Sequence, residues 1–158
     1  NSSAASDVYK RQPYYHVGFT FYDAGQWNEA VEWFDLALER FPDYLVCLYR
    51  KGVALFMKFK ARQAKDTLKK AIIVYQQSNN PDFKQRMSKY YYRSIFYLGK
   101  CYLQINSLNN ARACFEKILQ EDQRAYIDPL YVKYNLALSL MKLKKYWAKK
   151  IIVKIRMN

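Results

Sequence analysis

The chain contains very little of what catalytic and metal sites are built from. Its 158 residues include a single histidine, His16, and no set of His, Cys, Asp or Glu has the spacing of metal ligands. It has no glycine-rich phosphate loop, and no serine or cysteine stands in a motif with a candidate base. An isolated histidine is more often a polar surface residue than a general base. We therefore expect neither an enzyme nor a bound metal or cofactor.

Glycine, proline and long apolar runs are also scarce. There are four glycines and four prolines, while 51% of the residues are hydrophobic, which is typical of a globular, helical chain. No apolar run approaches the ~18 residues of a membrane-spanning helix, so we expect no membrane span. The three cysteines, Cys47, Cys101 and Cys114, are odd in number and far apart. They fit the free thiols of a reducing compartment, and we expect an intracellular, cytoplasmic protein.

Acidic residues are too few to balance the basic ones. The chain has 27 Lys and Arg against 13 Asp and Glu. Residues 11–44 hold six acids and two bases, whereas residues 45–158 hold 24 bases and six acids. Two interpretations stay open. The basic residues of 45–158 form a patch for RNA or another anionic surface, or they are solvated outer faces that dock acidic proteins.

What the chain does contain is a regular spacing of apolar residues, clearest in residues 11–44. The first group, spaced three and four residues apart, is Tyr14, Val17, Gly18 and Phe21. The second group follows a turn at residues 23–26 and comprises Trp27, Ala30, Phe34 and Ala37. Each group marks one face of a helix, and Pro42 ends the unit because proline cannot continue a helix. The small residues fall where two such helices must approach closely.

This unit resembles the tetratricopeptide repeat (TPR), a helix-turn-helix of about 34 residues with small, large and helix-breaking residues in fixed places. The pattern recurs. The matching residues of the second copy are Leu48, Gly52, Leu55, Ala64, Leu68 and Ala71; those of the third are Tyr92, Ile95, Leu98, Gly99, Tyr102, Ala111, Phe115 and Ile118; those of the fourth are Leu136, Ala137 and Leu140. The resemblance implies an all-α fold, an α-α superhelix (right-handed TPR solenoid) of about three and a half to four helix-turn-helix repeats.

The expected TPR domain covers residues 13–158, with repeats at about 11–44, 45–78, 92–125 and 130–158. Helices are expected at 13–24, 28–41, 44–58, 61–76, 82–104, 108–121 and 129–143. The insertion 79–91 lengthens the fifth of these helices and projects beyond the stack, or else it forms a loop. The stretch 144–147 resembles the usual turn of a repeat, but Ala148 comes one residue early for its place.

The two ends of the sequence depart from the repeat. Residues 1–12, NSSAASDVYKRQ, lack its periodicity and resemble a translated sequencing or cloning adapter, so we expect a non-native or disordered leader. The last residues, with Ile151, Ile152 and Ile155, make a poor polar cap for a solenoid. The sequence therefore favours a fragment of a larger TPR protein.

In TPR solenoids the first helix of each repeat lines a concave groove, so the resemblance implies that function resides there. The groove expected here is aromatic with a basic admixture. Its side chains are Tyr15, Phe19, Tyr22, Tyr49, Arg50, Phe56, Arg93, Phe96, Tyr97, Lys100, Tyr134 and Asn135. The alternative is that part of this stripe, at the places of Tyr15 and Phe19, is core under a neighbouring helix.

We expect a protein–protein interaction module or scaffold whose groove binds a peptide or helix of a partner, acidic partners included. The alternative is a nucleic-acid- or anionic-surface-binding helical repeat that uses the basic residues of 45–158. TPR domains that hold the C-terminal carboxylate of chaperones use two Lys, two Asn and one Arg from three successive helices. The corresponding residues here are Tyr15, Phe19, Arg50, Arg93 and Tyr97. We therefore expect no chaperone carboxylate clamp.

Overall fold

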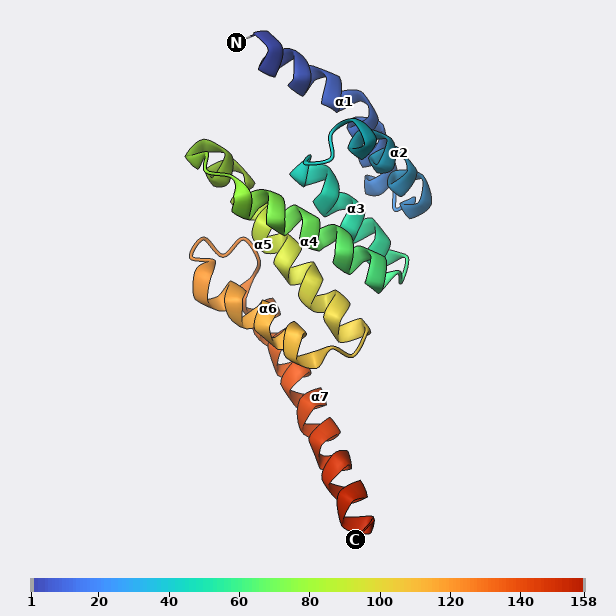
Figure 1. Ribbon diagram of the computed structural model, residues 1–158, viewed down its shortest axis with the longest axis vertical. Coiled ribbons are helices and arrows are strands. Elements are labelled where there is room, and N and C mark those ends of the chain that lie inside the picture. Colours follow the sequence, from blue (N-terminus) through green and yellow to red (C-terminus); the bar gives the residue numbers. More distant parts are fainter. Residues whose placement is uncertain (1, 158) are drawn as a thin grey trace.

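The computed structural model describes residues 2–157, with side chains from residue 13 onward, and this part of the chain is entirely helical (Figure 1). Its elements are α1 (Ser2–Asp23), α2 (Trp27–Arg40), α3 (Leu45–Met57), α4 (Ala61–Gln77), α5 (Pro81–Gln104), α6 (Leu108–Glu121) and α7 (Pro129–Arg156). The ends of α2 to α6 agree with the expected ones to within about one residue. The all-α fold that the sequence predicts is confirmed.

The helices stack in order along the long axis of the molecule, with the two termini at opposite ends (Figure 1). Three antiparallel pairs, α1–α2, α3–α4 and α5–α6, are followed by α7 alone. We call α1, α3, α5 and α7 the A helices and α2, α4 and α6 the B helices. Each A helix contacts the next A helix, and each B helix contacts the A helix that follows it. The result is a solenoid whose A helices share one side.

A glycine in each of the first three A helices lets the paired helices approach closely. A Cβ added to Gly18 would lie 2.7 Å from the ring of Phe34, and one added to Gly99 would lie 2.7 Å from the ring of Phe115. The corresponding distance from Gly52 to Leu68 is 2.6 Å. All three large residues belong to B helices and are fully buried or nearly so. The same small-to-large contact therefore holds each pair together.

The turns between paired helices share one backbone feature. Gly25, Phe59 and Asn106 each have a positive φ, of 72°, 58° and 59°. Glycine and asparagine adopt this left-handed conformation readily, whereas a phenylalanine is strained in it. Phe59 is 85% exposed, so its ring gains little packing in return. The turn geometry, and not the side chain, therefore dictates the conformation of residue 59.

Helix α1 is longer than the sequence predicted. We expected it to begin at residue 13, but it begins at Ser2 and carries Pro13 inside. Proline lacks the N–H that would bond the preceding turn, so the hydrogen-bond ladder of α1 is interrupted there. That residues 1–12 are a non-native or disordered leader stays a prediction. The side chains of these residues lie outside the described part of the chain.

Helix α5 runs for 24 residues, and its first turns pack against α4. Asn80 caps the helix by accepting a hydrogen bond from the N–H of Phe83 at 3.1 Å. The rings of Tyr75 and Tyr91 stack with centroids 4.1 Å apart, and the Tyr75 hydroxyl lies 3.2 Å from that of Ser88. The expectation that these turns project beyond the stack is therefore wrong. The aromatic residues of the insertion give it a surface on α4.

Helix α7 is straight and continuous to Arg156, so the turn expected at residues 144–147 is absent. Its first half packs on α6 and α5 through the buried Val132, Asn135 and Ser139. Its second half extends away from the stack, and every side chain from residue 144 to residue 157 is exposed (Figure 1). Lys144 stands where the other repeats have the left-handed residue of the turn, and lysine favours helix.

Candidate functional site

The accessible side chains of the A helices form one mixed aromatic and basic surface, which we call the A-helix face. Its half-buried members are Phe19 and Tyr22 of α1, Arg50 and Phe56 of α3, and Arg93, Tyr97 and Lys100 of α5. All seven were expected from the sequence. Because successive A helices contact one another, these residues form a band that crosses three repeats.

Arg50 is held by aromatic rings rather than by an acid. Its Cζ lies 3.9 Å from the ring centroid of Phe19 and 5.4 Å from that of Tyr22, within the range of cation–π attraction. Its Nε is buried and has no hydrogen-bond partner in the described chain.

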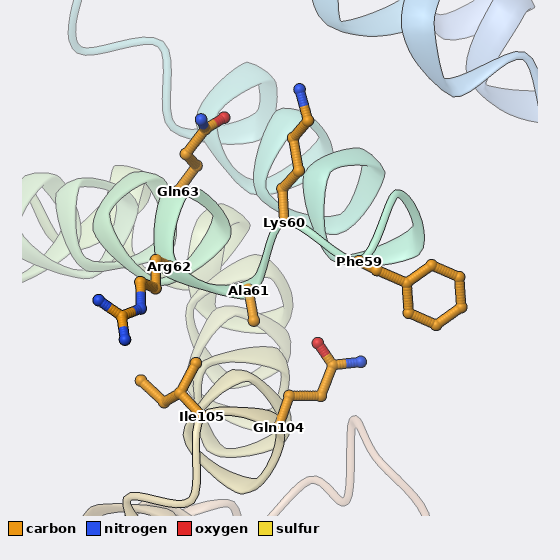
Figure 2. Close-up of a pocket in the computed structure, with 7 residues that line it drawn as sticks. All are labelled: Phe59, Lys60, Ala61, Arg62, Gln63, Gln104 and Ile105. Atoms are coloured by element: carbon orange, nitrogen blue, oxygen red, sulfur yellow. The ribbon is translucent and has the colours of Figure 1, made fainter.

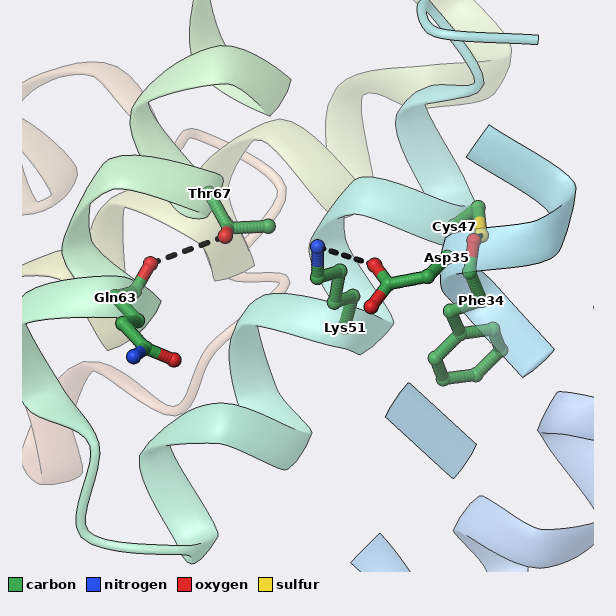
Figure 3. A network of polar contacts seen from close by, with 6 residues as sticks. All are labelled: Phe34, Asp35, Cys47, Lys51, Gln63 and Thr67. Carbon is green, nitrogen blue, oxygen red and sulfur yellow. Dashed lines mark hydrogen bonds and ion pairs between the residues drawn. The ribbon is translucent and has the colours of Figure 1, made fainter. Parts of the chain in front are cut away.

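Lys100 occupies a similar position one repeat further on. Its Nζ lies 5.0 Å from the ring centroid of Phe56, 5.3 Å from that of Tyr97 and 5.8 Å from that of Phe96. The ion pairs found among the described residues involve other cations, such as Lys51, which pairs with Asp35 between α3 and α2 (Figure 3). In this part of the chain the cations of the A-helix face therefore have no carboxylate partner.

Three of the expected aromatic residues are core rather than surface. Tyr15 is 8% exposed, Tyr49 is 6% and Phe96 is 4%, because this side of each A helix faces its own B helix or the next repeat. Their role as open anchors is therefore corrected in favour of the alternative that the sequence left open. Burial raises the pKa of Tyr15, and it raises that of Tyr49 to about 12 against the opposing effect of Arg93 and Arg50. Both hydroxyls stay neutral at ordinary pH.

The two expected residues of α7 differ in their exposure. Tyr134 is 63% exposed on the side of α7 that corresponds to Tyr15, Tyr49 and Phe96, where no B helix follows in the described chain. Asn135 is buried, and its Nδ2 donates a hydrogen bond of 2.8 Å to the carbonyl oxygen of Tyr131. The assignment of Asn135 to the groove is therefore corrected, whereas that of Tyr134 stays a prediction.

Two tyrosines near the A-helix face were missed. Tyr131 of α7 is half exposed, and its ring centroid lies 5.4 Å from that of Phe96 and 5.9 Å from the Nζ of Lys100. It occupies the same place in its repeat as Arg93, so the repeat register could have identified it. Tyr90 packs on Tyr49 at 5.6 Å, but it lies in the insertion, for which the register gives no place.

A separate pocket of about 550 Å³ lies where the α3–α4 turn meets the end of α5 (Figure 2). Its lining is Phe59, Lys60, Ala61, Arg62, Gln63, Gln104 and Ile105. The ring of Phe59 points away from the other lining side chains (Figure 2). This pocket contains none of the residues expected to bind a ligand, but Lys60 and Arg62 belong to the basic patch of the alternative interpretation.

The cysteines have the properties of core residues. Burial raises the pKa of the thiols of Cys47, Cys101 and Cys114 to about 12, so each is a neutral thiol at ordinary pH. Cys47 donates a weak hydrogen bond to the carbonyl oxygen of Phe34 at 3.6 Å (Figure 3). Among the side chains that the structure describes, from residue 13 to residue 157, we find no group that could hold a metal ion. No helix within the same range has the length and apolarity needed to cross a membrane.

Comparison with known proteins identifies the repeat. Residues 92–124 match the family model of the tetratricopeptide repeat. No curated protein matches the chain. The TPR2AB domain of yeast Sti1, solved as a complex with pHSP90, aligns with a TM-score of 0.65 and 21% identity over 90% of this chain and 51% of that one. The Sgt2 TPR domain from Aspergillus fumigatus aligns with a TM-score of 0.69 and 15% identity over 87% of this chain and 81% of that one. This chain thus spans about half of the Sti1 chain.

Proposed function

We propose that this chain is a protein–protein interaction scaffold, because residues 92–124 match the tetratricopeptide repeat and the chain has the fold of TPR domains. We further propose that the A-helix face binds an extended peptide or a helix of a partner protein. The tetratricopeptide repeat is an interaction fold, which favours a binding role over a catalytic one.

The observation that supports the proposal is a row of basic side chains that have no acidic partner in the described chain. Arg50 lies on α3, and Arg93 and Lys100 lie on α5. None of the three forms an ion pair among the described residues. Rings of Phe19, Tyr97 and their neighbours hold two of these cations in place, so little side-chain entropy is lost on binding. A partner segment with carboxylates spaced along it and apolar side chains between them fits this surface.

The proposed mode differs from a chaperone carboxylate clamp. The complex with pHSP90 is a property of the Sti1 domain and is not carried over to this chain. Here Arg50 and Tyr97 occupy clamp places where chaperone-binding TPR domains have Asn and Arg, and Tyr15 is core. We propose that carboxylates within a segment, rather than at its terminus, are bound.

The test measures peptide binding by fluorescence anisotropy. We would compare an acidic, aromatic-containing labelled peptide with its amide version, in which Gln and Asn replace Glu and Asp. The double variant Arg50→Gln/Lys100→Gln should bind the acidic peptide at least tenfold more weakly, a loss of about 1.4 kcal/mol. The control Lys69→Gln/Lys70→Gln removes two exposed cations from α4 and should change the affinity for the acidic peptide little.

A labelled RNA oligonucleotide is the second arm of the same test, because the basic residues of 45–158 offer the alternative function. Phosphate binding weakens steeply as salt rises. RNA binding that depends on Lys69 and Lys70 and exceeds peptide binding would replace the proposed function with the alternative one.

A further inference from the structure

One side of α7 carries an apolar stripe along almost its whole length. Tyr134, Ala137 and Met141 lie on it in the first half of the helix, and Ala148, Ile152 and Ile155 lie on it in the second half. Steps of three and four residues within each half place them on one side of an α-helix. All six are exposed, Ile155 by 70%. We call this set the α7 stripe, and nothing in the described chain covers it.

The first half of the stripe has the residue pattern that surrounds the close contact of each other A helix with its B helix. That pattern is large, small, large. It reads Tyr15, Gly18, Tyr22 in α1, Tyr49, Gly52, Phe56 in α3, and Phe96, Gly99, Leu103 in α5. In α7 it reads Tyr134, Ala137, Met141. The exposed side of α7 therefore has the residue pattern of an A helix that packs on a B helix.

The second half of the stripe has the pattern of a B helix. The inner sides of the B helices read Ala30, Phe34, Ala37 in α2, Ala64, Leu68, Ala71 in α4, and Ala111, Phe115, Ile118 in α6. The second half of α7 reads Ala148, Ile152, Ile155. In the three pairs the large middle residue packs on the small residue of the A helix, as Phe115 does on Gly99. In α7 the corresponding contact would place the side chain of Ile152 on Ala137.

These two complementary halves cannot meet within one straight helix. Ala137 and Ile152 are 15 residues apart, which is about 22 Å along α7. In the three helix pairs the matching residues are 16 apart, for example Gly99 and Phe115, and a left-handed residue makes the turn. The spacing of 15 residues in α7 is one residue too short for that turn, and the helix continues through this position. Shortened hinges of this kind favour exchange between copies over folding back.

We propose that the chain forms a symmetric dimer in which two α7 helices pair antiparallel through their stripes. Tyr134 of one copy then lies on Ile155 of the second copy, Ala137 on Ile152, and Met141 on Ala148. A twofold axis between Lys144 and Lys145 makes each pair occur twice. The surface is self-complementary, as a twofold interface requires. Each copy thereby completes the fourth repeat of the other.

Charge gives this pairing a distinctive salt dependence. Residues 129–157 contain no acid, and the four lysines nearest the axis, two from each copy, are Lys144 and Lys145. Like charges repel less as salt screens them, so the dimer should tighten at high salt. Binding of the same basic segment to RNA or to an anionic membrane would weaken instead.

Sedimentation equilibrium of the full chain tests the proposal. We expect a mass twice 19.0 kDa, with a dissociation constant that falls as salt rises. Ala137→Glu places a charge in the stripe at an exposed site and should abolish the dimer while circular dichroism stays unchanged. Lys142→Glu changes an exposed residue of α7 outside the stripe and should preserve the dimer. A glycine inserted between Leu143 and Lys144 restores the 16-residue spacing and should give a monomer that folds back.

A short thiol crosslinker on the double variant Tyr134→Cys/Ile155→Cys tests whether two chains pair antiparallel. These positions are about 31 Å apart in one straight helix, so a link between chains requires the antiparallel pairing. The native cysteines are buried and protected. A monomeric wild-type chain, a link within one chain, or equal loss of the dimer in Ala137→Glu and Lys142→Glu would overturn the proposal. Association that needs RNA or anionic vesicles and weakens with salt would overturn it too.

Discussion

The guanidinium of Arg50 on α3 lies over the ring of Phe19 on α1, with its Cζ 3.9 Å from the ring centroid. This contact joins the first two repeats on the side that the A helices share. It also orients a cation whose Nε has no hydrogen-bond partner in the described chain. The same side chain thus makes a stabilising contact and is the proposed binding group.

Replacing Arg50 by methionine separates these two roles, because methionine keeps an apolar chain and loses the charge. We expect the free energy of unfolding to fall by about 0.5–1 kcal/mol, the usual size of a cation–π contact at a surface. Acidic-peptide affinity should fall about tenfold. Urea denaturation and anisotropy measure the two effects. Arg62→Met, at an exposed cation beside the α3–α4 turn, is the control and should leave both unchanged.

Gly99→Ala tests the close approach of α5 and α6. The added Cβ would lie 2.7 Å from the Phe115 ring, which is buried and has little room to move. We expect a loss of about 1–3 kcal/mol in the free energy of unfolding, despite the higher helix propensity of alanine. Gln63→Ala at an exposed position of α4 is the control. A Gly99→Ala protein as stable as the wild type would show that the pair can separate freely.

Phe59 offers a test of backbone strain. Its φ of 58° suits glycine, and its exposed ring is dispensable. We expect Phe59→Gly to exceed Phe59→Ala in stability by about 1 kcal/mol, since only alanine retains the Cβ that opposes this conformation. Thermal unfolding of the two variants measures the difference. Equal stabilities would mean that the turn relaxes to a negative φ without cost.

The buried thiols make stability depend on pH in the alkaline range. The pKa of each thiol is about 12 in the folded chain and about 9 when exposed, so the folded state retains protons that the unfolded state releases. The resulting stability is fully present below pH 9 and is lost as the pH rises towards 12. The urea midpoint of the wild type should therefore fall between pH 8 and pH 11. In the triple variant Cys47→Ala/Cys101→Ala/Cys114→Ala the midpoint should fall less over the same pH range.

The sequence predicted the helices and their pairing well, because a 3.6-residue period and a small residue opposite a large one are local signals. Gly52 opposite Leu68 is such a case. It placed Tyr15, Tyr49 and Phe96 wrongly, since one repeat position can face either the partner helix or the solvent. Only the packing of neighbouring helices decides between these two.

The departures from the repeat were less predictable. The turn at residues 144–147 has suitable residues, yet Ala148 comes one residue early and the helix continues to Arg156. The insertion has no place in the repeat register, so the stacking of Tyr91 on Tyr75 could not be read from spacing. Both results depend on competition between a local backbone preference and contacts distant in the sequence.

The order of contacts along the stack also determines how the chain folds. Every packed pair of helices is adjacent in sequence or separated by a single element, so only short segments must close for each contact to form. Chains with such low contact order fold in microseconds to milliseconds, far faster than sheet proteins of similar size. Folding can start at any helix pair and spread to its neighbours. The molecule therefore assembles as a row of units rather than around one centre.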